Sequence, residues 1–145
     1  MANSSLQGSQ GGSGFITALG RLFFAAIFLL SGPRHFAAQT IAYVAHEGIP
    51  LASVLVPLSG AIAILGALSI LLGYHAKLGA WLIVLFLVPI TPAMHAFWGV
   101  KDPMMAQLQM IHFMKNLSML GGALLISQFG AGPWSLDARR EANER

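Results

Sequence analysis

The sequence predicts an all-α integral membrane protein, built as an antiparallel bundle of four transmembrane helices with a short interfacial helix in the first loop. Charged residues make up only 9% of the 145 residues, whereas a soluble domain carries about 25%. The hydrophobic residues, 56% of the chain, gather into four segments close to the roughly 20 residues needed to cross a bilayer. A soluble bundle of four such segments would keep too little polar surface to dissolve.

The four predicted spans follow one another along the chain. The first covers residues 15–32 and contains Arg21 near its start, from where the long side chain can reach the headgroups. The second covers residues 51–73 and the third residues 76–97. Prolines lie inside both, and membrane helices tolerate them because neighbouring groups satisfy the freed carbonyls, so we expect kinks there. The fourth span covers residues 108–129.

The segments outside the predicted spans are polar or short. Residues 1–14 are rich in Gly and Ser and uncharged, as expected of a flexible tail. Within the long first loop, residues 37–47 could form the interfacial helix. The connection at residues 74–75 is short enough to force an antiparallel hairpin. Residues 130–145 form a polar C-terminal tail, predicted as a solvated helix or a disordered end, after a membrane domain of residues 15–129.

The distribution of basic residues predicts the orientation. Four spans place both termini on one side of the membrane. That side would hold five bases, and the other side three: Arg21, Lys77, Arg139, Arg140 and Arg145 against Arg34, Lys101 and Lys115. Because positive loops stay in the cytoplasm, we expect an inner (cytoplasmic) membrane protein with both termini cytoplasmic. The bases are scattered, which disfavours nucleic acid as a partner; the lipid bilayer is the expected surrounding.

Polar residues gather at the non-cytoplasmic ends of the third and fourth spans. Three of them share one face of the fourth helix, at spacings of three and four residues: Gln109, His112 and Asn116. Lys115 borders that face, and the stretch MHAFW brings two more polar or amphipathic side chains to the same depth. Ionisable residues within a membrane are functional candidates. The predicted ligand-binding residues are therefore His95, Trp98, Gln109, His112, Lys115 and Asn116.

Several readings of this cluster stay open. A quinone or another amphipathic molecule would suit it. A bis-histidine haem site is disfavoured because no spacing requires two facing imidazoles, and no metal site is predicted. In the structural alternative, Lys115 reaches the membrane surface and Asn116 bonds a neighbouring helix. The chain has no cysteine and no Ser-His-Asp, HExxH or phosphate-binding glycine pattern. We therefore predict no catalytic residues and no enzyme activity by the chain alone.

Several motifs together resemble the DoxX family. They are LGRLFFAAIFLLSGPRHF (19–36), GIPLASVL (48–55), LGALSILLGYHAKLGAWL (65–82), MHAFW (94–98), FMKNLSMLGGALLI (113–126) and SLDARR (135–140). The resemblance spans about residues 15–140 and implies a four-helix inner-membrane protein. It matches Lys115 and Asn116 to that family's Lys-Asn pair and His95 and Trp98 to the polar end of its third helix. The chain departs from the family at Ala63, where members often carry a glutamate.

The resemblance implies a non-catalytic accessory or anchoring subunit of a membrane redox complex, with a protein partner. One alternative is a quinone-interacting subunit in thiosulfate or related sulfur oxidation, which is the system that gave the family its name. Another is a small transporter or permeability protein, which four helices could form only as a homo-oligomer. Co-purifying partners, quinone turnover and proteoliposome flux would separate the three.

Overall fold

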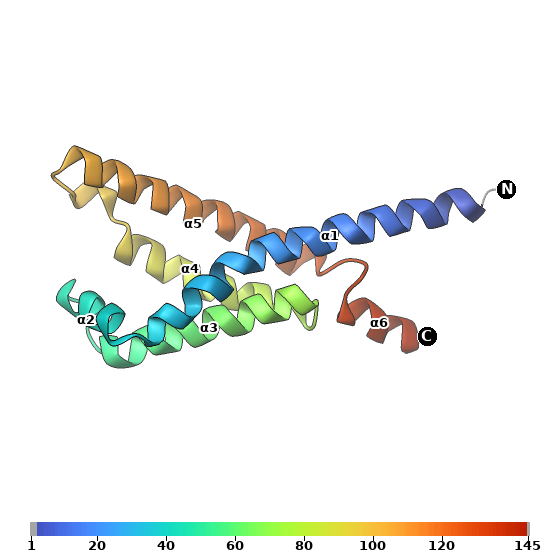
Figure 1. The fold of residues 1–145 in the computed structure, drawn as a ribbon, viewed down its shortest axis with the longest axis horizontal. Coiled ribbons are helices and arrows are strands. Elements are labelled where there is room, and N and C mark those ends of the chain that lie inside the picture. Colours follow the sequence, from blue (N-terminus) through green and yellow to red (C-terminus); the bar gives the residue numbers. More distant parts are fainter. Residues whose placement is uncertain (1–2, 145) are drawn as a thin grey trace.

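The structure, a computed structural model, describes residues 3–144, with side chains from residue 12, and in this part all the regular secondary structure is helical (Figure 1). Within it there are six α-helices, two short 3₁₀ helices and no strand. In chain order these are α1 (Asn3–Ser31), η1 (Gly32–Phe36), α2 (Ala38–His46), α3 (Ala52–Leu72), α4 (Ala76–Met94), η2 (Phe97–Gly99), α5 (Pro103–Phe129) and α6 (Leu136–Asn143). The all-α prediction is confirmed.

Three segments of the described chain are long and apolar enough to cross a membrane: Gly12–Phe36, Ala52–Leu72 and Ala76–Gly99. They correspond to the first three predicted spans. Helix α5 has 27 residues, which at about 1.5 Å per residue exceeds the roughly 30 Å of hydrocarbon. It is not among the three candidates, because its polar residues lower its hydropathy. The four-span bundle therefore stays a prediction.

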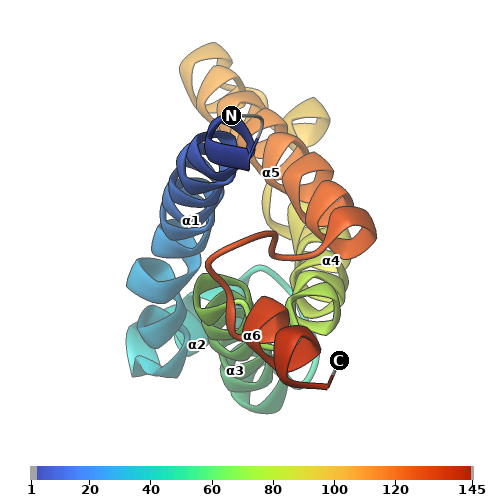
Figure 2. The same ribbon diagram turned by 90° about the vertical axis from the view of Figure 1, so that its right-hand side faces the viewer.

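The long helices pack as neighbours, α1 on α3, α3 on α4 and α4 on α5. Figures 1 and 2 show α3 and α4 running antiparallel. Both ends of the described chain lie at the end of the molecule that holds the turn between α3 and α4. Small residues allow the close approach: a Cβ on Gly66 would lie 2.8 Å from the carbonyl oxygen of Gly79. The buried core gathers there, from Ala25, Phe28, Ala63, Ala67, Ile70, Ala80, Ile83, Leu87 and Ala123. Ala63 and Ala67 of α3 are almost completely buried in these contacts.

Helix boundaries differ from the predicted ones where local capping decides them. Helix α5 begins at Pro103, not at residue 108, because the Asp102 carboxylate accepts from the Met105 N–H at 2.8 Å and proline suits the first helical turn. Helix α1 begins at Asn3, so helix replaces the predicted tail from that residue onward. Residues 1–2 of that tail lie outside the described chain. The predicted helix at 37–47 is present as α2.

The C-terminal tail contains a capped helix fastened to the rest of the chain. Ser135 caps α6 by accepting from the Ala138 N–H at 3.1 Å. The two carboxylate oxygens of Asp137 accept from the backbone N–H groups of His75 and Ala76, at 2.8 and 3.0 Å. One side of α6 is therefore docked on the α3–α4 turn, although its outer residues are exposed. We call residues 130–143 the C-terminal arm.

Candidate functional site

The polar face predicted on the last long helix is turned toward α4. Gln109 and His112 are partly buried and Asn116 is 7% exposed, whereas Lys115 beside them is exposed. The residues at this spacing continue as one packed stripe down to the buried Ala123. The helical periodicity of the sequence therefore gave the correct face of α5.

His95 and His112 lie against one another. His95 follows the last residue of α4, where its backbone N–H donates to the Thr91 carbonyl at 3.0 Å. Its ring stacks on that of His112, with centroids 5.2 Å apart and an interplanar angle of 29°. The structure thus brings together two of the predicted site residues that lie on different helices.

The hydrogen bonds of this pair assign a proton to each ring. His95 Nδ1 lies 2.7 Å from Gln109 Oε1, an amide oxygen that only accepts, so His95 in its neutral form carries its hydrogen on Nδ1 and has an acceptor at Nε2. The Lys115 ammonium lies 3.4 Å from His112 Nδ1 and can only donate. His112 in its neutral form therefore carries its hydrogen on Nε2. The stacked rings present one acceptor and one donor.

Trp98 belongs to an aromatic group at the edge of the cluster. Its ring meets Phe97 and Phe113 edge to face, with centroids 5.2 and 5.9 Å away, and Phe97 meets Phe113 at 5.6 Å. Trp98 itself is 64% exposed. Because Phe113 adjoins His112 in the chain, these rings form an apolar margin next to the histidine pair.

Asn116 joins two helices below the histidine pair. Its Nδ2 donates to Thr91 Oγ1 at 3.2 Å, and the Thr91 hydroxyl donates to the Leu87 carbonyl at 2.6 Å. Both side chains are buried. This contact is the helix-locking role that the sequence left open for Asn116. Thr91 was not predicted as its partner. The sequence signal that could have identified it is a single hydroxyl residue between Pro89 and Pro92 in a mostly apolar span.

His35 is a polar group of the bundle that was not among the predicted site residues. The Ser59 hydroxyl donates to the Val56 carbonyl at 2.7 Å, so it accepts from His35 Nδ1–H at 2.9 Å. The imidazole also packs on Phe86, with centroids 5.7 Å apart. The sequence signal was a histidine directly after the first span. No hydrogen bond or ring contact links His35 to the His95–His112 pair in the described chain.

The described residues contain no group of three or more His, Cys, Asp or Glu side chains arranged to hold a metal ion. The donors of the cluster are imidazole, amide and ammonium groups. Such a set is suited to hydrogen bonding with the polar head of an organic molecule.

Comparison with known proteins places the chain in a different family from the predicted one. Residues 23–142, from within α1 to α6, match the sequence model of the SURF4 family. The chain is also similar to the inner membrane protein YphA of Escherichia coli (strain K12). The two are 27% identical over 123 residues, which is 83% of this chain and 87% of the relative. No solved structure gives a significant match.

The predicted DoxX membership is wrong, because both matches point elsewhere. What that resemblance implied therefore loses its support. The roles that the resemblance assigned to His95, Trp98, Lys115 and Asn116 are no longer supported. The same holds for the interpretation of Ala63 as the position of a missing glutamate. The contacts of these residues described above do not depend on the resemblance.

Proposed function

The chain belongs to the SURF4 family, and from that starting point we propose that it is a multi-pass inner-membrane protein whose His95–His112 pair binds the head of an amphipathic molecule. The name of the similar E. coli protein and the three candidate spans support the location. In this proposal α5 is the fourth span, α2 lies at the interface, and both termini are cytoplasmic. Their position at one end of the bundle supports an even number of spans (Figure 1).

The observation that carries the proposal is the paired donor and acceptor of the stacked rings. His112 Nε2–H can donate to a carbonyl, and His95 Nε2 can accept from a hydroxyl, as the tautomers above require. A quinone offers the carbonyl, and its reduced form, the hydroquinone, offers the hydroxyl. The Lys115 ammonium adds a cationic donor next to His112. The remaining predicted residue, Trp98, would contribute apolar ring surface together with Phe113.

A binding measurement tests the cluster. The probe is a short-chain ubiquinone, titrated into the full chain in lipid nanodiscs. The readout is quenching of Trp98 fluorescence, after Trp81→Phe and Trp134→Phe have removed the other two indoles. We expect His112→Leu to weaken binding about two- to twelvefold, as the loss of one hydrogen bond worth roughly 0.5–1.5 kcal/mol implies.

The matched control is His46→Leu, the same change at an exposed histidine of α2. We expect it to leave the affinity unchanged. Equal affinity of the unchanged protein and His112→Leu, or equal losses in both variants, would refute the proposed site. A quinone that fails to bind the unchanged protein would also refute it.

The topology is tested separately, because the chain has no cysteine of its own. Single cysteines at Lys101 and Glu141 are offered to a membrane-impermeant maleimide in intact spheroplasts. We expect Lys101→Cys to react from outside and Glu141→Cys only after the membrane is opened. Reaction of both from the same side would contradict α5 as a span.

The accessory role in a redox complex, the link to sulfur oxidation and the transport role stay predictions. The first two came from the overturned resemblance, and no contact in the structure favours any of the three. Mass spectrometry of proteins that co-purify in gentle detergent would address the partner. A redox enzyme in fixed ratio would support the first role, and a lone homo-oligomer would count against it.

A further inference from the structure

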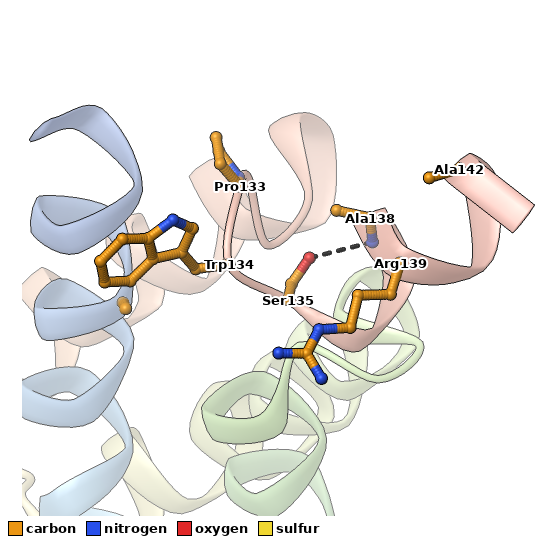
Figure 3. A pocket seen from close by; sticks show the side chains of 7 residues that line it. Pro133, Trp134, Ser135, Ala138, Arg139 and Ala142 are labelled. Atoms are coloured by element: carbon orange, nitrogen blue, oxygen red, sulfur yellow. Dashed lines mark hydrogen bonds between the residues drawn. The ribbon is translucent and has the colours of Figure 1, made fainter. Parts of the chain in front are cut away.

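A second candidate site lies at the opposite end of the bundle, between α1 and α6. An open hollow of about 560 Å³ is lined there by Ala18, Pro133, Trp134, Ser135, Ala138, Arg139 and Ala142. Figure 3 shows the Trp134 indole directed toward α1 and the Arg139 side chain extending from α6 past Ser135. The polar cluster of α4 and α5 does not contribute to its lining.

The wall of the hollow is held by a buried cation. Arg21 is 5% exposed, and its Nη2 donates to the carbonyl oxygen of Trp134 at 2.7 Å. Its Nε and Nη1 are buried with no hydrogen-bond partner in the described chain. The guanidinium Nη1 lies against Gly73, and Arg21 is not among the residues that line the hollow.

The one charged side chain that lines the hollow is the cation of Arg139. The Asp137 carboxylate, in the first turn of α6, already accepts from the backbone N–H groups of His75 and Ala76 with both oxygens. Arg139 is exposed, and its guanidinium makes no hydrogen bond in the described chain. A concave surface lined by an exposed arginine whose guanidinium makes no hydrogen bond in the described chain attracts anions.

The apolar lining indicates what kind of anion fits. Apart from Ser135 and Arg139, the hollow is formed by alanine, proline and tryptophan side chains. Ala18 lies near the start of the first candidate span, where a helix enters the membrane. One turn further along α1, Leu22 is 47% exposed and extends the apolar surface from the hollow along the helix. An anion that carries an acyl chain fits this arrangement: its phosphate group would lie by the arginine, and its acyl chain would lie along the apolar face of α1.

We propose that this hollow binds the headgroup of an anionic phospholipid, with Arg139 as the donor to the phosphate and the acyl chain lying along α1 beside Leu22. Trp134 would sit at the boundary between headgroup and hydrocarbon, where indole rings are favoured. Basic pockets at this depth are a known means of recognising anionic lipids. The site is independent of the amphipathic-ligand site proposed above.

Native mass spectrometry of the full chain tests the proposal. The purified protein is mixed with equal amounts of phosphatidylglycerol and phosphatidylcholine, and the bound lipids are compared. We expect phosphatidylglycerol to be retained about fivefold over phosphatidylcholine, since an arginine near an anionic group contributes about that factor. Arg139→Gln should bring the ratio close to one, whereas the control Arg34→Gln, an exposed arginine in η1 at the other end, should keep it.

A second variant guards against a general effect of charge. Ala142→Phe fills the hollow without changing any charge, and we expect it to lower the retained phosphatidylglycerol as well. No preference in the unchanged protein, or equal losses in Arg139→Gln and Arg34→Gln, would overturn the proposal. Inorganic phosphate is the competing occupant: if phosphate alone raises the thermal stability of the unchanged protein but not of Arg139→Gln, without lipid preference, the lipid assignment is wrong.

Discussion

Asp137→Ala should release the C-terminal arm from the bundle. The carboxylate caps the first turn of α4 from 62 and 61 residues away, at 2.8 and 3.0 Å from the N–H groups of His75 and Ala76. The arm is also held by the Asp137 N–H, which donates to the Gly73 carbonyl at 2.8 Å, and by Arg140, whose Nη1 lies 3.1 Å from His75 Nε2. Alanine keeps the backbone contact but removes both caps.

The magnitude follows from the loss of two capping hydrogen bonds. Removal of a capping side chain costs about 0.5–2 kcal/mol. The His75 contact is exposed and the Ala76 contact is partly buried, so water can satisfy one freed N–H more easily than the other. We therefore expect about 1.5 kcal/mol for docking of the arm, which corresponds to a roughly tenfold larger open population.

Limited trypsin digestion after Arg139 and Arg140 measures that population, because cleavage follows the open fraction when the arm opens and closes rapidly. We expect cleavage of Asp137→Ala to be about ten times faster than that of the unchanged protein, by the same conversion. Asp137→Asn keeps one acceptor oxygen and should fall between them. Peptides of residues 130–145 with each substitution correct for the effect of the neighbouring acid on trypsin itself.

Asp102→Ala is the matched control. It removes the same type of cap, from Met105 N–H at 2.8 Å, but at the start of its own helix α5. It should weaken that helix end and leave cleavage of the arm unchanged. If Asp137→Ala and the unchanged protein are cleaved at the same corrected rate, or if Asp102→Ala accelerates cleavage equally, the arm is not held by this contact and the reasoning is refuted.

Two further predictions concern helix packing, both read from unfolding in mixed micelles with increasing SDS. Asn116→Leu removes the donor to Thr91 and should destabilise the protein by roughly 0.5–1.5 kcal/mol; an unchanged midpoint would show that the contact adds nothing. Gly66→Ala should cost about 1–3 kcal/mol because its Cβ meets the Gly79 carbonyl. Gly121→Ala should be neutral or stabilise by up to about 1 kcal/mol, since nothing lies within 4 Å of its Cβ; effects of the same sign at both glycines would contradict the described approach of α3 and α4.

The family prediction failed for a physical reason. Membrane helices draw on a small set of apolar and small residues, so short stretches such as those at 19–36 and 113–126 resemble many unrelated membrane proteins. The helical class survives this error because it rests on segment length and on the scarcity of charge, which any membrane bundle shares. The matched residues did not survive as evidence for a redox role.

The sequence by itself determined the helical membrane class, three apolar segments of spanning length, and the face of α5 that carries Gln109, His112 and Asn116. These follow from local properties, since hydropathy and a period of 3.6 residues act within one segment. The Asp102-Pro103 start of α5 was also present in the sequence as a capping signal, although the predicted boundary missed it.

Only the tertiary structure decided which groups face one another. The stacking of His95 on His112, the bond from Asn116 to Thr91 and the capping of α4 by Asp137 join residues 17, 25 and 61–62 positions apart. A periodic pattern fixes the face of one helix, but not the rotation or depth of the helix beside it. Those are set by how closely the small residues let α3, α4 and α5 approach, and by where the last turn folds the C-terminal arm back.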